Sequence, residues 1–251
     1  MKKFQYNGME FTLKFLGVVG SNLHGVNVAN SDVDYKGVFT WNQDLLFGMK
    51  NLPSSLDKKN TDKDSWNNLL NQLNNEFNLN LQEDDDLVLY DAKTFFDLSF
   101  KNDLNMFDML YSSKEFVLYE TKAFENVKNN KDKFLNPYLS SNRFFGMSTT
   151  YLNDAKNNKG NVNKNYSKAL QTLFSLEFLL KNNYYSCSLD NDKKNYLLNV
   201  RNGNYSLEEY FKTLENLKNE LNSLPLDKLY NARSVHFDFM NQLLVDLYKE
   251  F

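Results

Sequence analysis

The stretch GSNLHGVNVANSDVDYKG, residues 20–37, differs in composition from the rest of this 251-residue chain. It contains three of the chain's nine glycines and two aspartates, Asp32 and Asp34, that stand two residues apart. It follows LKFLGVV, an apolar run typical of a buried strand. A strand that ends in Gly-Ser, with Gly25 soon after, predicts a tight turn into a short helix. Such a turn directs backbone N–H groups and the helix dipole outward, where phosphate oxygens bind.

The two aspartates begin the next expected strand. Because side chains alternate along a strand, Asp32 and Asp34 are expected on one face, with Val33 pointing into the core. Two neighbouring carboxylates repel each other unless a cation lies between them, and Mg²⁺ is commonly held by one or two carboxylates plus substrate phosphates. The pattern therefore outlines a nucleotide site. The alternative is the solvated start of a strand with an Asx turn, in which His24 is a packed helix residue.

The residues before position 92 favour strands. Asn7-Gly8 separates two apolar runs and predicts a hairpin turn. DLVLYD, residues 86–91, predicts a further strand. Between them SWNNLLNQLNNEF, residues 65–77, is amphipathic and is either a helix or a mobile insertion.

From residue 92 onward the apolar spacing becomes helical. Ser206 followed by Glu209 is a capping box, and the last helix is expected within residues 239–251. We therefore expect an α+β fold. Its mixed sheet with flanking helices occupies a domain of residues 1–113, and a helical C-terminal domain follows over 114–251.

The composition excludes several classes of protein. A net charge of −3 gives no global basic field for nucleic-acid binding, and 41% apolar residues indicate a folded chain. Cys187 is the single cysteine, so no internal disulfide forms and a reducing compartment is expected. No apolar run approaches the roughly 18 residues that span a bilayer, and the N-terminus does not resemble a signal peptide. We expect a cytoplasmic protein with no membrane partner.

The residues 20–38 resemble the signature of the DNA polymerase β nucleotidyltransferase superfamily. More narrowly, they resemble the predicted nucleotidyltransferases associated with RNA repair, including their bacteriophage relatives, which implies the host cytoplasm if the chain is of phage origin. The resemblance implies that Gly20 and Ser21 contact phosphates. It also implies that Asp32 and Asp34 bind divalent metal ions, and Lys36 completes the narrower pattern as a nucleotide-binding residue.

The superfamily also uses a third carboxylate on a later strand. The run Asp84, Asp85 and Asp86 precedes the strand expected over 86–91. The resemblance favours Asp86 as this third catalytic and metal-binding carboxylate, with Asp84 or Asp85 as alternatives because the register of the run is open. Without the first motif, the run reads as an acidic turn before a strand.

The resemblance covers about residues 14–39 and 84–112 well and 165–210 loosely. It implies that Lys168 binds the nucleotide and that Asp108 has a structural role. Relatives often carry a His and an Arg after this Lys, and here Thr172 and Phe174 stand near those places. Residues 155–176 contain no acidic residue, and their lysines suit a triphosphate or an RNA backbone. A solvated loop and helix start is the preferred alternative for all of them except Lys168.

These observations together predict a Mg²⁺-dependent or Mn²⁺-dependent nucleotidyltransferase. It would transfer a nucleoside monophosphate from an NTP to an acceptor hydroxyl and release pyrophosphate. The acceptor is left open between an RNA 3′ end, a protein and a small molecule. The alternative is a catalytically inactive nucleotide-binding or interaction protein on the same fold.

Overall fold

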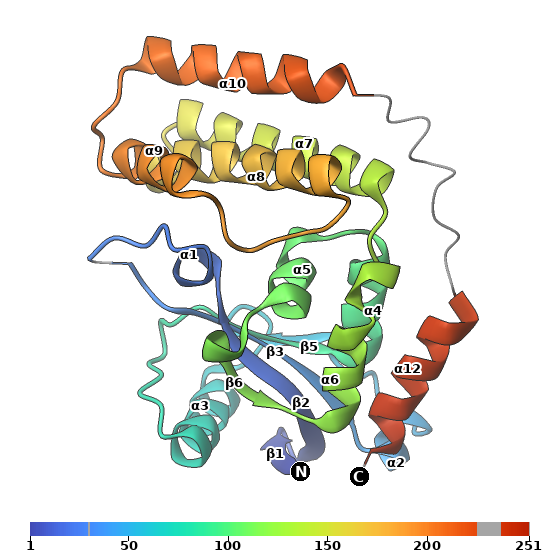
Figure 1. Cartoon of the computed structure of the whole chain (residues 1–251). Helices are drawn as coiled ribbons and strands as arrows, with labels where there is room; N and C mark the ends of the chain where they lie inside the picture. The colour runs from blue at the N-terminus through green and yellow to red at the C-terminus, as the bar shows by residue number, and fades with distance from the viewer. Residues whose placement is uncertain (30, 225–236, 251) are drawn as a thin grey trace.

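The structure is a computed structural model that describes residues 1–29, 31–224 and 237–250 of the chain. Its fold is α+β, as the sequence predicts (Figure 1). Strands in the described residues form one sheet in the order β1-β2-β3-β5-β4, and β6 pairs with the part of β2 beyond β1. The strands are β1 (Lys2–Tyr6), β2 (Met9–Val19), β3 (Asp34–Trp41), β4 (Ser55–Asp57), β5 (Leu87–Asp91) and β6 (Val117–Glu120).

The hairpin predicted at Asn7-Gly8 is confirmed. Strands β1 and β2 pair antiparallel, with Tyr6 opposite Met9. Asn7 and Gly8 both have left-handed backbones, with φ of 50° and 71°. A two-residue turn with positive φ at both positions matches the twist of the flanking strands, and Asn-Gly is the favoured pair for it.

Helices cover both faces of the sheet (Figure 1). The stretch 65–77 is helical, because α3 (Lys63–Phe77) packs Leu69 and Leu73 against the face formed by Phe11 and Phe39. The opposite face is covered by α4, α5 and α6. The shorter helices of this part are α1 (Gly20–Leu23), α2 (Gln43–Leu46), α4 (Ala92–Phe100), α5 (Leu104–Tyr111) and α6 (Lys122–Asn129).

The later helices form a layer next to α1 and α5, as Figure 1 shows. This layer consists of α7 (Pro137–Lys156), α8 (Val162–Asn182) and α9 (Asn191–Arg201), and α10 (Leu207–Asn222) packs on its far side (Figure 1). The predicted capping of α10 is confirmed, because the hydroxyl of Ser206 accepts the backbone N–H of Glu209 at 3.1 Å. No helix in the described ranges has the length and apolar character needed to cross a membrane.

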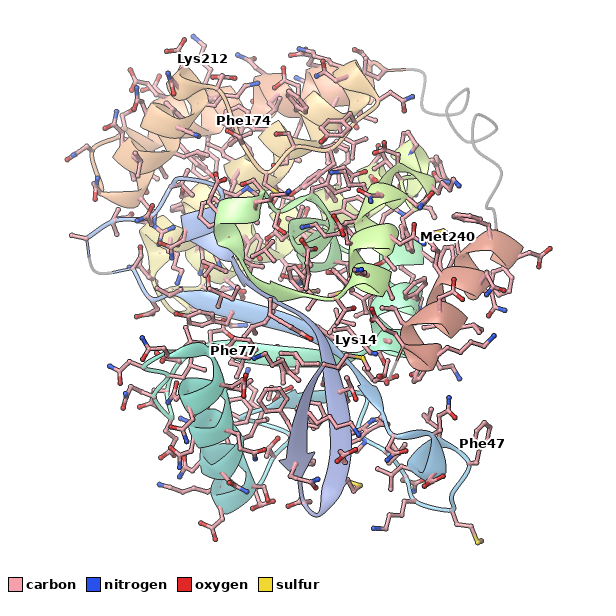
Figure 2. The ribbon with its side chains drawn as sticks, turned by 60° about the horizontal axis from the view of Figure 1, so that its bottom comes forward. Lys14, Phe47, Phe77, Phe174, Lys212 and Met240 are labelled. Carbon is pink, nitrogen blue, oxygen red and sulfur yellow. The ribbon has the colours of Figure 1, made fainter. Side chains whose placement is uncertain are left out.

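The hydrophobic core continues across residue 113. Strand β6 lies beyond that residue yet belongs to the sheet. Helix α12 (Phe237–Lys249) returns to pack beside α4 and α6 with Met240 fully buried (Figures 1 and 2). The last expected residue of this helix, Phe251, lies outside the described residues. One core cluster therefore joins the sheet to the C-terminal helices, and Phe15 and Leu173 both belong to it.

The start of β3 differs from the expectation. The strand begins at Asp34, and Val33 is 36% exposed and not in the core. A turn before the strand explains the difference: Ser31 N–H donates to the Val28 carbonyl at 2.8 Å, and Val28 N–H donates to the Ser31 hydroxyl at 2.9 Å. The side-chain amide of Asn22 also donates to the Asp32 carbonyl at 3.2 Å. These contacts keep Asp32 in the loop, so Asp32 and Asp34 do not share a strand face.

Candidate active site

A polar cavity of about 160 Å³ lies where the sheet meets the layer of later helices. We refer to it as the site cavity. Segments from the whole length of the chain contribute to its wall, since β2, β3, α1, α5, α7, α8 and α9 all supply residues. The lining residues that carry charge are His24, Asp34, Lys36, Asp86, Asp108, Lys164, Lys168 and Arg201.

Asp34 and Asp86 are brought together by strand pairing. Strands β3 and β5 are parallel, and Tyr35 pairs with Leu87. Asp34 directly precedes Tyr35, and Asp86 directly precedes Leu87, so the two aspartates stand at corresponding positions. The Tyr35 N–H donates to the Asp86 carbonyl at 2.8 Å, which holds the two strand starts in register. Both side chains line the site cavity.

The two carboxylates influence each other. Burial, and then the charge of Asp86, raise the pKa of the Asp34 carboxyl, while Lys168 and Lys164 oppose the shift. Burial disfavours the ionised form of Asp34 and the charge of Asp86 adds to this, so a cation bound beside Asp34 would stabilise its carboxylate. Paired carboxylate oxygens are ligands that hard cations such as Mg²⁺ prefer, so this donor set fits the expected metal.

The other carboxylates of the acidic run lie elsewhere. Asp84 is exposed and forms an ion pair with Lys58. The Asp85 carboxylate accepts the backbone N–H of Gln82 at 2.7 Å. Neither residue lines the site cavity, whereas Asp86 does. The geometry thus favours Asp86 within the run.

Asp32 does not join Asp34 and Asp86 in this structure. Its side chain is exposed and does not line the site cavity. Within the described ranges, no group of three His, Cys, Asp or Glu side chains is close enough to hold one metal ion. Of the three aspartates that the resemblance assigns to metal binding, Asp34 and Asp86 line the site cavity.

Gly20 and Ser21 form the wall opposite Asp34. Gly20 has a left-handed backbone with φ of 66° and begins α1, which is only four residues long. A Cβ atom at Gly20 would lie 3.0 Å from Cγ of Asp34 and closer still to its Oδ2. Glycine is therefore needed at position 20 for its backbone conformation and for the close approach of the Asp34 side chain.

Gly20→Ala is expected to impair the site as well as the fold. The left-handed backbone costs a non-glycine residue roughly 1–2 kcal/mol, and the added methyl group displaces the Asp34 carboxylate. Gly8→Ala is the matched control, because Gly8 also has positive φ but has no atom within 4 Å of the added carbon. Thermal unfolding should show similar losses for both variants, and NTP binding should weaken only in Gly20→Ala. Equal NTP binding by the two variants would contradict this role of Gly20.

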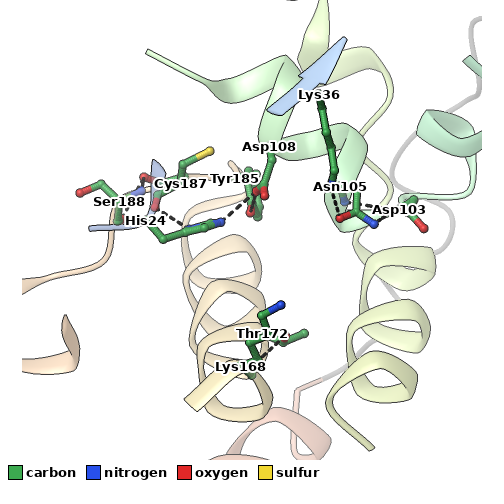
Figure 3. Close-up of polar contacts among 11 residues, drawn as sticks. His24, Lys36, Asp103, Asn105, Asp108, Lys168, Thr172, Tyr185, Cys187 and Ser188 are labelled. Atoms are coloured by element: carbon green, nitrogen blue, oxygen red, sulfur yellow. Dashed lines mark hydrogen bonds and ion pairs between the residues drawn. The ribbon is translucent and has the colours of Figure 1, made fainter. Parts of the chain in front are cut away.

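Lys36 and Lys168 approach the carboxylates from two sides. The Lys36 ammonium on β3 donates to the Asn105 side-chain carbonyl (Figure 3). Burial lowers the pKa of Lys36, against the opposing charges of Asp108 and Asp86. Burial and then the neighbouring charge of Lys164 lower the pKa of Lys168. Both lysines that the resemblance assigns to nucleotide binding therefore line the site cavity, Lys36 among aspartates and Lys168 beside Lys164.

Two further cations in the cavity are Lys164 and Arg201. Lys164 lies one helical turn before Lys168 on α8 and lines the same cavity. The spacing of the lysines therefore indicated an anion-binding residue at position 164, although a solvated loop was the preferred interpretation from the sequence. Arg201 is the last residue of α9 and donates to the Ser31 hydroxyl at 3.1 Å. Along the described chain, Lys36, Lys164, Lys168 and Arg201 have no carboxylate within salt-bridge distance, although all line the cavity. This unpaired positive charge suits an anionic ligand.

The two positions where relatives often carry a His and an Arg lie in different environments. Thr172 lines the site cavity, and its hydroxyl donates to the Lys168 carbonyl at 2.8 Å (Figure 3). Phe174 is buried in the hydrophobic core and does not line the cavity.

His24 and Asp108 form a buried pair at the edge of the cavity (Figure 3). His24 Nδ1 is 2.8 Å from the Cys187 carbonyl oxygen, and Nε2 is 3.0 Å from Oδ1 of Asp108. The carbonyl and the carboxylate only accept hydrogen bonds, so both ring nitrogens donate and His24 is an imidazolium. The Tyr185 hydroxyl also donates to Asp108 Oδ1, at 3.2 Å.

The pKa values of this pair follow from the contacts. Burial by itself lowers the pKa of His24, but the charge and hydrogen bond of Asp108 and the hydrogen bond to the Cys187 carbonyl together outweigh it, and the net shift is upward. Burial by itself raises the pKa of Asp108, but His24 and Lys36 outweigh it, and the net shift is downward. The pair ties α1 to α5 and to the segment around Cys187, which is the structural role that the sequence suggests for Asp108.

Comparison with known proteins gives one family. The RNA repair pathway DNA polymerase beta family matches residues 3–246. No curated protein and no solved structure matches the chain. The matched range includes every residue that lines the site cavity.

Proposed function

This chain belongs to the RNA repair pathway DNA polymerase beta family, and we propose that it is a divalent-metal-dependent nucleotidyltransferase. Its substrate is an NTP, and it transfers the nucleoside monophosphate to an acceptor hydroxyl. The observation that carries the proposal is the pairing of Asp34 with Asp86 at the starts of two parallel strands, facing unpaired cations in one cavity.

The reaction requires these groups in defined roles. The acceptor oxygen attacks the α-phosphorus, the bond to the bridging oxygen of the β-phosphate breaks, and pyrophosphate leaves. Asp34 and Asp86 would hold a Mg²⁺ or Mn²⁺ ion, which would supply charge neutralisation and lower the pKa of the acceptor hydroxyl. Lys168 stabilises the charge that develops on the leaving pyrophosphate, because a fixed cation in a cavity acts there without reorganisation.

The remaining residues bind and orient the triphosphate. Gly20 and Ser21 border it on the side of α1, and Lys36 fixes it from the sheet. Lys164 and Arg201 extend the positive wall along α8 and α9. We keep Asp32 as a proposed further metal ligand, which has to turn inward from the loop before β3 to reach the site.

One observation favours the alternative of an inactive nucleotide-binding or interaction protein. Asp32 lies outside the cavity, so the metal site is incomplete if the loop stays as it is. The two functions differ in turnover, while both predict NTP binding. An RNA 3′ end, a protein hydroxyl and a small molecule remain the candidate acceptors.

The two functions are separated by a binding and transfer experiment. Each of the four NTPs is titrated with and without Mg²⁺ or Mn²⁺, and NTPs labelled with ³²P at the α or γ position are then incubated with RNA and with protein. We expect metal-dependent binding and transfer of the α label only, because the γ label leaves with pyrophosphate. Metal-independent binding with no transfer of the α label would support the inactive protein.

A further inference from the structure

A second cavity adjoins the site cavity along α7. It has a volume of about 500 Å³, and we call it the α7 cavity. Asn105, Met147 and Tyr151 line both cavities, so the two share a wall. Its other lining residues are Asp103, Asn142, Arg143, Gly146 and Thr150.

The two cavities differ in charge. The site cavity has four cations without salt-bridge partners among its described lining residues. The only charged residues described around the α7 cavity are Asp103 and Arg143, and these form an ion pair with each other. Its remaining polar groups are neutral amides and hydroxyls. The site cavity thus suits phosphates, whereas the α7 cavity suits a neutral polar group.

The volumes of the two cavities also indicate that a nucleoside triphosphate needs both of them. Pockets for ligands of drug size typically have roughly 300–1,000 Å³, and the site cavity has only about 160 Å³. It is therefore too small for a whole nucleoside triphosphate. The α7 cavity begins at the shared wall and supplies the missing space.

Residues of the shared wall contact polar groups of both cavities. Asn105 accepts a hydrogen bond from Lys36 on the phosphate side and donates to the Asp103 carboxylate at 3.1 Å on the other (Figure 3). The ring of Tyr151 has the Lys168 ammonium 5.5 Å from its centroid and also borders the α7 cavity. Aromatic rings stack on bases, and amide side chains such as Asn142 pair with base edges.

We propose that the α7 cavity binds the nucleoside part of the donor NTP, with the triphosphate in the site cavity. This inference rests on the proposed function, because it divides one substrate between two adjoining cavities. Helix α7 then determines how strongly the base contributes to binding.

Gly146 offers a clean test of this assignment. It is exposed in the middle of α7, and a Cβ atom placed on it meets no atom within 4 Å. Gly146→Phe therefore fills the α7 cavity without a clash at the backbone, and it replaces a residue of low helix propensity. Thr150→Phe enters the same cavity from an exposed position one turn later and serves as a second variant. Asn153→Phe is the matched control, because Asn153 is exposed on the same helix and lines neither cavity.

The experiment compares NTPs with inorganic tripolyphosphate, both in the presence of Mg²⁺. Wild-type protein should bind an NTP more tightly than tripolyphosphate. Gly146→Phe and Thr150→Phe should each weaken NTP binding by about tenfold or more, which corresponds to about 1.4 kcal/mol. Both should leave tripolyphosphate binding unchanged, and Asn153→Phe should change neither. Circular dichroism confirms that each variant is folded.

Other outcomes overturn the assignment in distinguishable ways. Equal binding of NTP and tripolyphosphate by the wild type would remove the nucleoside site while leaving the proposed function intact. NTP binding that is unchanged in both cavity variants, with a raised KM for the acceptor, would assign the α7 cavity to the acceptor. A wild-type protein that binds neither ligand would overturn the proposed function and this inference together.

Discussion

Asp34→Asn is expected to abolish nucleotide transfer while the protein remains folded. The substitution keeps the size of the side chain and removes the partly buried charge of Asp34. Loss of one preorganised electrostatic group costs up to about a thousandfold in rate, and a metal-binding charge should cost at least that. Metal-dependent NTP binding should be lost together with transfer, because the cation joins protein to triphosphate.

The same variant should be more stable than the wild type when no metal is present. The pKa of Asp34 is raised in the folded protein, so the folded state holds its proton more tightly than the unfolded state does. Stability of the wild type therefore falls as pH rises from about 4, the unfolded value, through the raised pKa. Asn carries no proton to lose, so the melting temperature of the variant should exceed that of the wild type at neutral pH.

The nucleotide transfer and the thermal stability of Asp34→Asn together test this prediction. Asp84→Asn is the control, because Asp84 is exposed, pairs with Lys58 and does not line the site cavity. It should retain transfer and metal-dependent NTP binding. An Asp34→Asn protein that transfers nucleotide at the wild-type rate would refute the metal-site assignment. A variant with wild-type stability and NTP binding would instead indicate a solvated strand start.

Asp108→Asn should cause a large loss of stability. It leaves the His24 imidazolium buried without its counter-charge and weakens the contact from Tyr185. Removing one partner of a buried ion pair costs roughly 3–5 kcal/mol. For a domain of this size that lowers the melting temperature by on the order of 10 °C. Asp97→Asn is the control, because the Asp97–Lys101 pair is exposed and such pairs contribute at most about 1 kcal/mol.

The stabilisation by this pair should depend on pH at both ends. The pKa of Asp108 is lowered, so its contribution is present above the unfolded value of about 3.9 and is lost as pH falls through the lower folded pKa. The pKa of His24 is raised, so its contribution is complete below about 6.5 and is lost as pH rises through the higher folded pKa.

Denaturant unfolding at several pH values measures this dependence. The difference in free energy of unfolding between wild type and Asp108→Asn should be largest between about pH 4 and 6.5 and should shrink on either side. A difference that stays constant from pH 4 to 9 would contradict the assignment of His24 as an imidazolium.

Local features of this fold were predictable because they depend on a few neighbouring residues. The Asn7-Gly8 turn needs two residues that accept positive φ, and the Ser206 cap needs one hydroxyl near a free N–H. The mostly helical structure after residue 91 follows from the change in apolar period, although β6 at Val117–Glu120 is a strand within that region. The motif at residues 20–37 likewise pointed to the family, which the match over residues 3–246 shows.

Other features were decided by strand pairing. The resemblance favoured Asp86 within the acidic run but left the register open, and the pairing of β3 with β5 brings Asp86 to the same cavity as Asp34. Alternation also predicted a strand from Asp32 onward. The turn at Val28 and Ser31 delays that strand by two residues, because hydrogen bonds within the loop outweigh the weak preference of a single valine for the core.

The walls of the site were decided by tertiary packing alone. Arg201 reaches Ser31 across 170 positions of sequence, and His24 meets Asp108 across 84. Residue patterns record the conformational preferences of short segments, whereas such contacts exist only because helices α5, α8 and α9 bury apolar faces that bring distant segments together. The sequence by itself therefore determined the family, most of the secondary structure and the Asp34 motif. Tertiary packing decided which cations surround that motif and where a second cavity opens beside it, because both depend on how whole helices pack.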